Sequence, residues 1–164
     1  MKRVLVVLAV LMIVPTIAFA QLGVGPAVFY GSPVLLGQSI DLEEANVEQF
    51  SFGADVRYRI GWFQASALGL YSIGDVNSID MFLDAGVALD LAILTFSVGG
   101  GPNLTNNHNG GPVMTAGLNA RTIVDVKVGP VSAGMSYIMA MNLDDGIRIR
   151  TSRGLLGAHV LFWL

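Results

Sequence analysis

The side chains of this sequence that could do chemistry are mostly carboxylates, and several recur at even spacing. Asp80 and Asp84 lie four residues apart, with Asp90 further along the same segment. Paired carboxylates can act as general acid and general base when the pKa of one of them is raised. Interior ion pairs explain the same residues more simply, and the arginines available for them are Arg57, Arg59 and Arg121. We therefore expect salt bridges here in place of acid–base catalysis.

Two histidines are the other candidates for catalysis or metal binding. His108 stands among turn-forming residues, whereas His159 falls in an alternating segment near the end of the chain and is expected to face inward. Neither has a second ligand nearby in the sequence, and the chain contains no cysteine. No Gly-x-Ser-x-Gly nucleophile motif occurs, and the glycine run at 99–101 lacks the Lys and Ser or Thr of a phosphate-binding loop. The sequence therefore predicts no enzyme, no cofactor and no metal site.

The composition points away from an ordinary water-soluble domain. The chain has 164 residues, of which 53% are hydrophobic and only 13% are charged, about half of the usual 25% or so of charged residues. A formal net charge of −3 excludes a nucleic-acid-binding or disordered chain, since both need a high net charge. The length fits one domain.

The first twenty residues resemble an export signal. Lys2 and Arg3 precede an apolar run over 4–14, and an Ala-x-Ala pattern ends at Ala20. A retained membrane helix is the alternative, but the run is shorter than the roughly 20 residues that a bilayer requires, and Pro15 would break it. We expect a cleaved signal peptide at 1–20 and one domain at 21–164.

The rest of the chain alternates between apolar and polar residues with a period of two, which indicates strands with one apolar face. Eight such segments are predicted. In 62–73 both faces are apolar, so the pattern does not say which face is which. The four clearest segments are 47–60, 79–90, 113–128 and 131–142, and the four weaker ones are 22–30, 62–73, 93–101 and 147–164.

The polar faces are small, rich in glycine and mixed in charge, which fits a narrow interior more than a face turned to water. The fold class predicted is therefore all-β, a closed eight-stranded antiparallel transmembrane barrel with lipid outside. The alternative is a soluble lipocalin-like barrel with its apolar face inward, whose sparsely charged exterior would dissolve poorly. The lumen network expected in the first case comprises Asp55, Arg57, Arg59, Asp80, Asp84, Asp90, Asn119, Arg121, Asp125 and Lys127.

The connections between the segments alternate in length. Short turns are expected at Gly61, at 90–92 and at 129–130, and longer loops at 31–46, 74–78, 102–112 and 143–146. Short turns on one rim and long loops on the other are typical of outer-membrane barrels whose termini lie in the periplasm. Aromatic residues gather beside the short turns and predict a girdle at that interface, formed by Tyr58, Trp62, Phe63, Phe162 and Trp163.

Charged residues also mark two of the connections. Four acidic residues between 41 and 48 make the first loop negative, which fits a solvated loop or contact with cations or basic surfaces. Arg148, Arg150 and Arg153 either touch anionic headgroups or fill the lumen mouth against Asp144 and Asp145.

The eight amphipathic segments, the Ala-Phe-Ala at 18–20 and the closing Val-Leu-Phe-Trp-Leu at 160–164 resemble the small outer-membrane β-barrel superfamily (OmpA/OmpX/OmpW type). In that group a terminal aromatic residue is read by the barrel-assembly machinery, whereas this chain ends in Leu164. The resemblance implies a bacterial outer-membrane location, with lipid and that machinery as partners and no catalytic residues. It also implies a role in envelope structure, surface interaction or slow passage of small solutes. The extracellular partner is not indicated.

Overall fold

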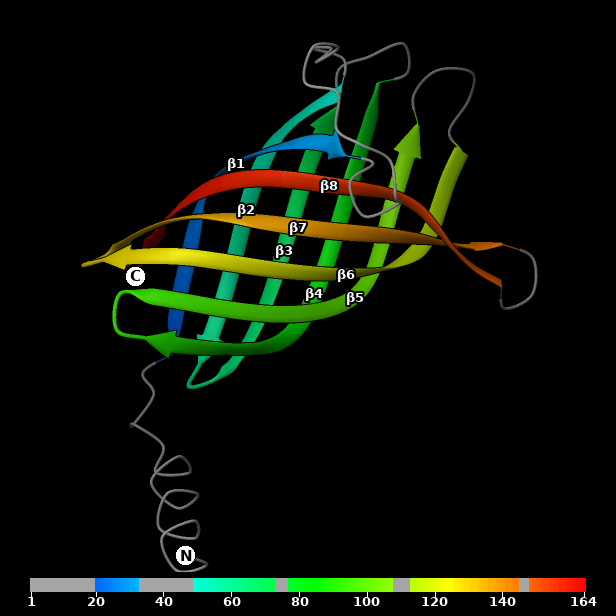
Figure 1. Cartoon of the computed structure of the whole chain (residues 1–164). Helices are drawn as coiled ribbons and strands as arrows, with labels where there is room; N and C mark the ends of the chain where they lie inside the picture. Colours follow the sequence, from blue (N-terminus) through cyan, green and yellow to red (C-terminus); the bar gives the residue numbers. More distant parts are fainter. Residues whose placement is uncertain (1–19, 33–48, 73–76, 108–112, 145–147) are drawn as a thin grey trace, which may run out of the picture.

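A computed structural model describes residues 20–32, 49–72, 77–107, 113–144 and 148–164, and these form a single antiparallel sheet closed into a barrel. Each strand pairs with the next along the chain, and the first pairs with the last (Figure 1). The eight-stranded fold predicted from the sequence is confirmed. The strands are β1 (Gln21–Ser32), β2 (Phe50–Ile60), β3 (Phe63–Ser72), β4 (Ser78–Leu91), β5 (Leu94–Asn107), β6 (Val113–Val128), β7 (Val131–Asp144) and β8 (Arg148–Trp163).

The strand ends lie within three residues of the predicted segments, except in β5. There the prediction of a loop over 102–112 is wrong for residues 102–107, because these residues belong to β5, which continues to Asn107. Asn103 and Thr105 pair with Phe82 and Asp80 of β4. Their polarity imitates a loop in the sequence, but Asn103 is buried in the lumen wall. The loop expected at 74–78 likewise ends one residue early, at Ser78 of β4.

Several other predictions lie outside the described residues. They are the signal peptide at 1–19, the acidic residues between 41 and 48, His108, and the side chains of Arg148, Arg150 and Arg153. Among the residues described, no helix is both long and apolar enough to cross a membrane.

Three two-residue turns connect β2 to β3, β4 to β5 and β6 to β7, all at the end of the barrel where β1 begins and β8 ends (Figure 1). We call this the turn end. Each turn opens with a residue in the left-handed region, with φ of 59° at Gly61, 56° at Ala92 and 61° at Gly129. Glycine adopts this conformation readily, whereas a Cβ makes it costly at Ala92.

Large apolar side chains point outward on the strands, and the buried arginine and aspartate side chains point into the barrel. Asp55 and Arg57 of β2 are fully buried, while Val56 and Tyr58 between and beside them are exposed. The uncertain segment 62–73 is resolved in the same way: Gln64, Ser66, Leu68 and Leu70 of β3 face inward and are buried. This orientation is opposite to that of a lipocalin-like binder, so the structure does not favour that alternative.

Candidate functional site

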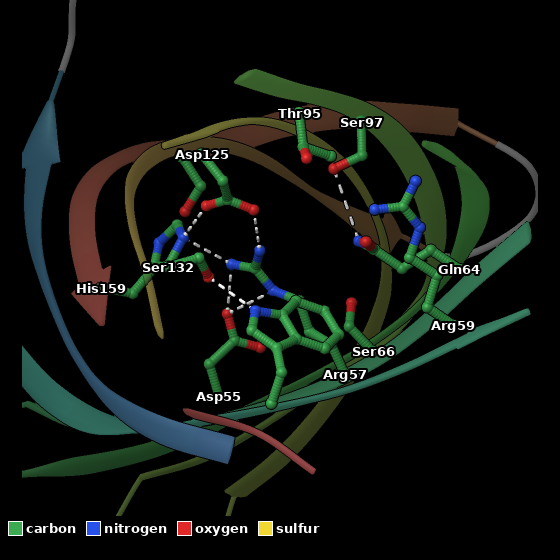
Figure 2. Close-up of polar contacts among 12 residues, drawn as sticks. Asp55, Arg57, Arg59, Gln64, Ser66, Thr95, Ser97, Asp125, Ser132 and His159 are labelled. Carbon is green, nitrogen blue, oxygen red and sulfur yellow. Dashed lines mark hydrogen bonds and ion pairs between the residues drawn. The ribbon is translucent and has the colours of Figure 1, made fainter. Parts of the chain in front are cut away.

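The centre of the lumen holds a cluster of arginine, aspartate and histidine side chains from opposite walls, which we call the ionic cluster: Asp55, Arg57, Arg121, Asp125 and His159. The guanidinium of Arg57 donates to Asp55 on its own strand and, at 2.7 Å, to Oδ2 of Asp125 on β6 (Figure 2). Arg121 Nη2 lies 2.6 Å from Asp55 Oδ2. Because β2 and β6 are four strands apart in a ring of eight, these ion pairs span the interior.

His159 of β8 completes the ionic cluster. Its Nε2 contacts Asp125 and lies 2.9 Å from Arg57 Nη2. Gly134 is paired with His159 on the neighbouring strand, and a Cβ at that glycine would collide with the carboxylate of Asp125. The small residue at 134 therefore leaves the space that the Asp125 carboxylate occupies.

A histidine beside an aspartate is also a feature of nucleophilic catalysis, in which the free imidazole nitrogen activates a hydroxyl. The two neighbouring lumen hydroxyls have other partners. Ser132 Oγ accepts from Trp163 Nε1 at 2.8 Å, and Ser136 Oγ lies 3.3 Å from Arg121 Nη2. In the described residues no group of three or more histidine, aspartate or glutamate side chains could hold a metal ion. The geometry of the ionic cluster is that of a structural bridge.

Asp84 lies beside the ionic cluster at a cavity about the size of one water molecule, which Gln64, Ser66, Ser97 and Arg121 also line. Ser66 Oγ donates to one oxygen of Asp84 at 3.0 Å, and Arg121 Nη1 lies 3.6 Å from that oxygen. Among the described protein atoms, the other oxygen of Asp84 and Nε of Arg121 have no hydrogen-bond partner. A bound water would satisfy both, so this half of the lumen suits water.

A second charged group lies at the turn end. Arg59 makes a two-pronged contact with Asp90, at 2.9 and 2.7 Å, and Thr95 Oγ1 donates to the same carboxylate. The Asp90 side chain is 58% exposed, so it belongs to the rim and not to the buried interior. Lys127 Nζ donates to Gln21 Oε1 at 2.8 Å and lies 4.9 Å from the ring centroid of Trp163.

The ten residues predicted as one lumen network are therefore divided among three places. Asp55, Arg57, Arg121, Asp125 and the adjacent Asp84 lie at the centre. Arg59, Asp90 and Lys127 lie at the turn end. Asp80 and Asn119 are buried further from the turns, where Asp80 accepts from Thr105 and Asn119 donates to the Gly101 and Pro102 carbonyls.

The aromatic residues near the short turns also divide. Tyr58, Trp62, Phe63 and Phe162 are exposed on the outside of the barrel, as a girdle requires. Trp163 does not belong with them, because consecutive residues of a strand point to opposite faces and Phe162 points outward. The indole of Trp163 is turned into the lumen and donates to the buried Ser132.

The sequence analysis missed an apolar layer inside the barrel, which we call the apolar septum: Phe29, Leu68, Leu70, Phe82, Ile138 and Leu155. These side chains are at most 2% exposed and belong to one contiguous cluster. A Cβ at Gly157 would collide with the ring of Phe29, so the glycine leaves room for the ring. The apolar character of both faces in 62–73 was the signal, since Leu68 and Leu70 occupy inward positions there.

Comparison with known proteins shows which solved structures share this fold. No family model and no curated protein matches the sequence. The N-terminal β-barrel domain of Pseudomonas aeruginosa OprF superposes with a TM-score of 0.67 at 13% identity, over 88% of this chain and 97% of that one. Neisserial surface protein A superposes with a TM-score of 0.52 at 16% identity, over 87% of this chain and 96% of that one. The fold is therefore the closed eight-stranded barrel of small outer-membrane proteins, as the sequence resemblance implies.

Proposed function

We propose that this protein is an integral barrel of the bacterial outer membrane whose lumen is filled by its own side chains. It acts in envelope structure or surface interaction, with at most slow passage of small solutes. The observation that carries this proposal is the inverted distribution of polarity. Large apolar side chains are exposed around the outside, while arginine and aspartate side chains are buried within.

The dimensions of the apolar exterior match a bilayer. On β4 the outward positions from Ile79 to Leu91 are apolar. Twelve residue steps of about 3.3 Å at a tilt of about 40° rise about 30 Å, the thickness of a hydrocarbon core. The closed sheet also leaves no unpaired edge, and lipid requires this because it offers no hydrogen bonds.

The filled lumen argues against a wide pore. An eight-stranded barrel has an interior just large enough for side chains. Here the ionic cluster and the apolar septum both bridge opposite walls. We include no catalytic step in the proposal, and the two serine hydroxyls of this region, Ser132 and Ser136, accept hydrogen bonds from Trp163 and Arg121.

Export and insertion complete the proposal. The expected signal peptide would direct the chain out of the cytoplasm, and the barrel-assembly machinery would read β8. Phe162, an aromatic residue on the outer face two positions before Leu164, is the candidate for that recognition.

Two measurements test the function. The native protein should stay with the outer-membrane fraction and change its migration in detergent gels on heating, as a closed barrel does. Release by osmotic shock without detergent would overturn the membrane assignment. Single-channel recording should show no large stable conductance, and a wide open state in the purified monomer would overturn the filled lumen.

A further inference from the structure

The apolar septum crosses the whole width of the barrel. Its members come from β1, β3, β4, β7 and β8. In a closed ring of eight strands, β3 and β4 face β7 and β8 across the interior. A contiguous cluster that includes Phe82 on one wall and Leu155 on the other therefore spans the lumen between these two walls.

The septum lies at a defined height. On β3, Gln64 and Ser66 near the turn end are followed by Leu68 and Leu70. On β4 the matching order is Asp84 and then Phe82, with Asp80 beyond. The septum thus begins beyond the ionic cluster, and Asp80, which is paired with Leu70 and accepts from Thr105, lies at its far edge.

The two layers differ in what they offer to an ion or to water. The ionic cluster carries donors and acceptors, and beside it lies the water-sized cavity at Asp84. The septum side chains themselves are hydrocarbon, and against them an ion loses its hydration and gains no partner. Apolar constrictions of this kind stop conduction by excluding water. The Arg121 guanidinium, 5.9 Å from the ring centroid of Phe29, marks where the two layers meet.

We propose that the apolar septum, and not the ionic cluster, is the barrier that keeps this barrel from conducting ions. Water enters from the turn end as far as Asp84 and Arg121 and stops at Phe29 and Phe82. This inference rests on the proposed function of a membrane barrel with a filled lumen, and it assigns the seal within that lumen to particular residues.

The test compares the flux of potassium and chloride through purified barrels in lipid vesicles. The septum variant combines Leu70→Ser on β3 with Phe82→Ser on β4, and so removes apolar volume from the septum on both strands. Its matched control combines Met81→Ser with Leu83→Ser, on the exposed outer face of β4 on either side of Phe82. A third variant, Asp125→Asn, weakens the ionic cluster. Heat-modifiable migration confirms that each variant is a closed barrel.

We expect the septum variant to raise ion flux by about tenfold or more, which corresponds to a barrier lower by about 1.4 kcal/mol. The outer-face control and Asp125→Asn should leave the flux at the wild-type level. If the double variant does not fold, Leu70→Asn, which keeps the branching and the number of side-chain heavy atoms, serves instead and should also raise the flux. A folded septum variant with wild-type flux, or an equal rise in Asp125→Asn, would overturn the proposal. A large conductance in the wild-type protein would contradict the proposed function instead.

Discussion

Arg57 is the side chain whose loss should damage the barrel most. It is fully buried and holds two carboxylates, Asp55 at 2.7 Å and Asp125 at 2.7 Å, on opposite walls. Replacing it by methionine keeps most of the volume but leaves Asp125 with His159 as its remaining side-chain partner. Breaking a buried ion pair by removing one partner costs about 3–5 kcal/mol. We expect Arg57→Met to lower the free energy of unfolding by that amount.

The double variant isolates the electrostatic part of this loss. Asp125→Asn alone should cost about 1–3 kcal/mol, the usual cost of weakening a buried polar contact. Arg57→Met combined with Asp125→Asn removes one positive and one negative charge, and Asp55 keeps its partner Arg121. The double loss should therefore fall short of the sum of the single losses by about 1–3 kcal/mol, the range for residues in direct contact.

The assay is urea unfolding of the barrel in lipid vesicles, followed by tryptophan fluorescence under reversible conditions. The matched control is Arg59→Met at the turn end, whose partner Asp90 is largely exposed. A pair with one solvent-exposed partner is screened by water, so this variant should cost less than Arg57→Met, about 1 kcal/mol. Additive losses in the Arg57 and Asp125 cycle, or equal losses at Arg57 and Arg59, would refute the reasoning that the buried pair bridges the walls.

Three further results are expected. Ala92→Gly should raise the free energy of unfolding by about 1 kcal/mol, because residue 92 has a φ of 56° that costs an L-residue about that much; a loss in the urea assay would contradict this. In single-tryptophan variants, a lipid-borne quencher should reduce the fluorescence of Trp62 strongly and that of Trp163 weakly, since only Trp62 faces outward; equal quenching would place both on the same face. Gly157→Ala should destabilise the barrel by about 1–3 kcal/mol through overpacking against Phe29, and Phe29→Leu should restore part of the loss in the same assay, whereas no rescue would mean that the ring is not the obstacle.

The strands could be predicted because a closed barrel imposes one simple rule on the sequence. In a membrane-spanning barrel every strand has lipid on one side and lumen on the other, so the outward residues are apolar and most inward residues are small or polar. The rule is harder to recognise where the inward polar residues are types that also favour turns. Asn103 and Thr105 look like a loop because asparagine and threonine are common in turns, yet they are lumen residues of β5.

The alternation of strand residues also corrects the membership of the predicted aromatic girdle. Phe162 and Trp163 were grouped because both are aromatic and near the end of the chain, but a period of two forbids them the same face. Their neighbours settle which of them faces inward: His159 and Leu161 are buried, so Trp163 continues the inward series. Here the alternation in the sequence carried more information than the type of residue.

The alternation does not predict which inward side chains contact one another. Alternation fixes the face of a side chain, whereas its height in the barrel depends on the register of all eight pairings. Arg57 and Asp125 are 68 residues apart and touch because both lie at one height on opposite walls. Asp80 and Asp84, four residues apart on β4, lie on opposite sides of Phe82 and so belong to different layers. Sequence spacing could not show that the first pair touches and the second does not. The height of each side chain in the barrel depends on the pairings of all strands, including the closure between β1 and β8.

The apolar septum follows from the same distinction and shows its consequence for function. An inward leucine or phenylalanine looks in the sequence like an imperfection in the polar face, and no single one of them suggests a barrier. Leu68 and Phe82 are partners on the neighbouring strands β3 and β4, whereas Leu155 comes from β8, and all three belong to one contiguous cluster. Ionised side chains at one height hold the walls together, and hydrocarbon at the next height excludes ions. In a barrel too narrow for a pore, one layer can thus stabilise the walls while the adjacent layer blocks ions. Changing the ionic cluster should therefore alter stability and leave ion flux unchanged.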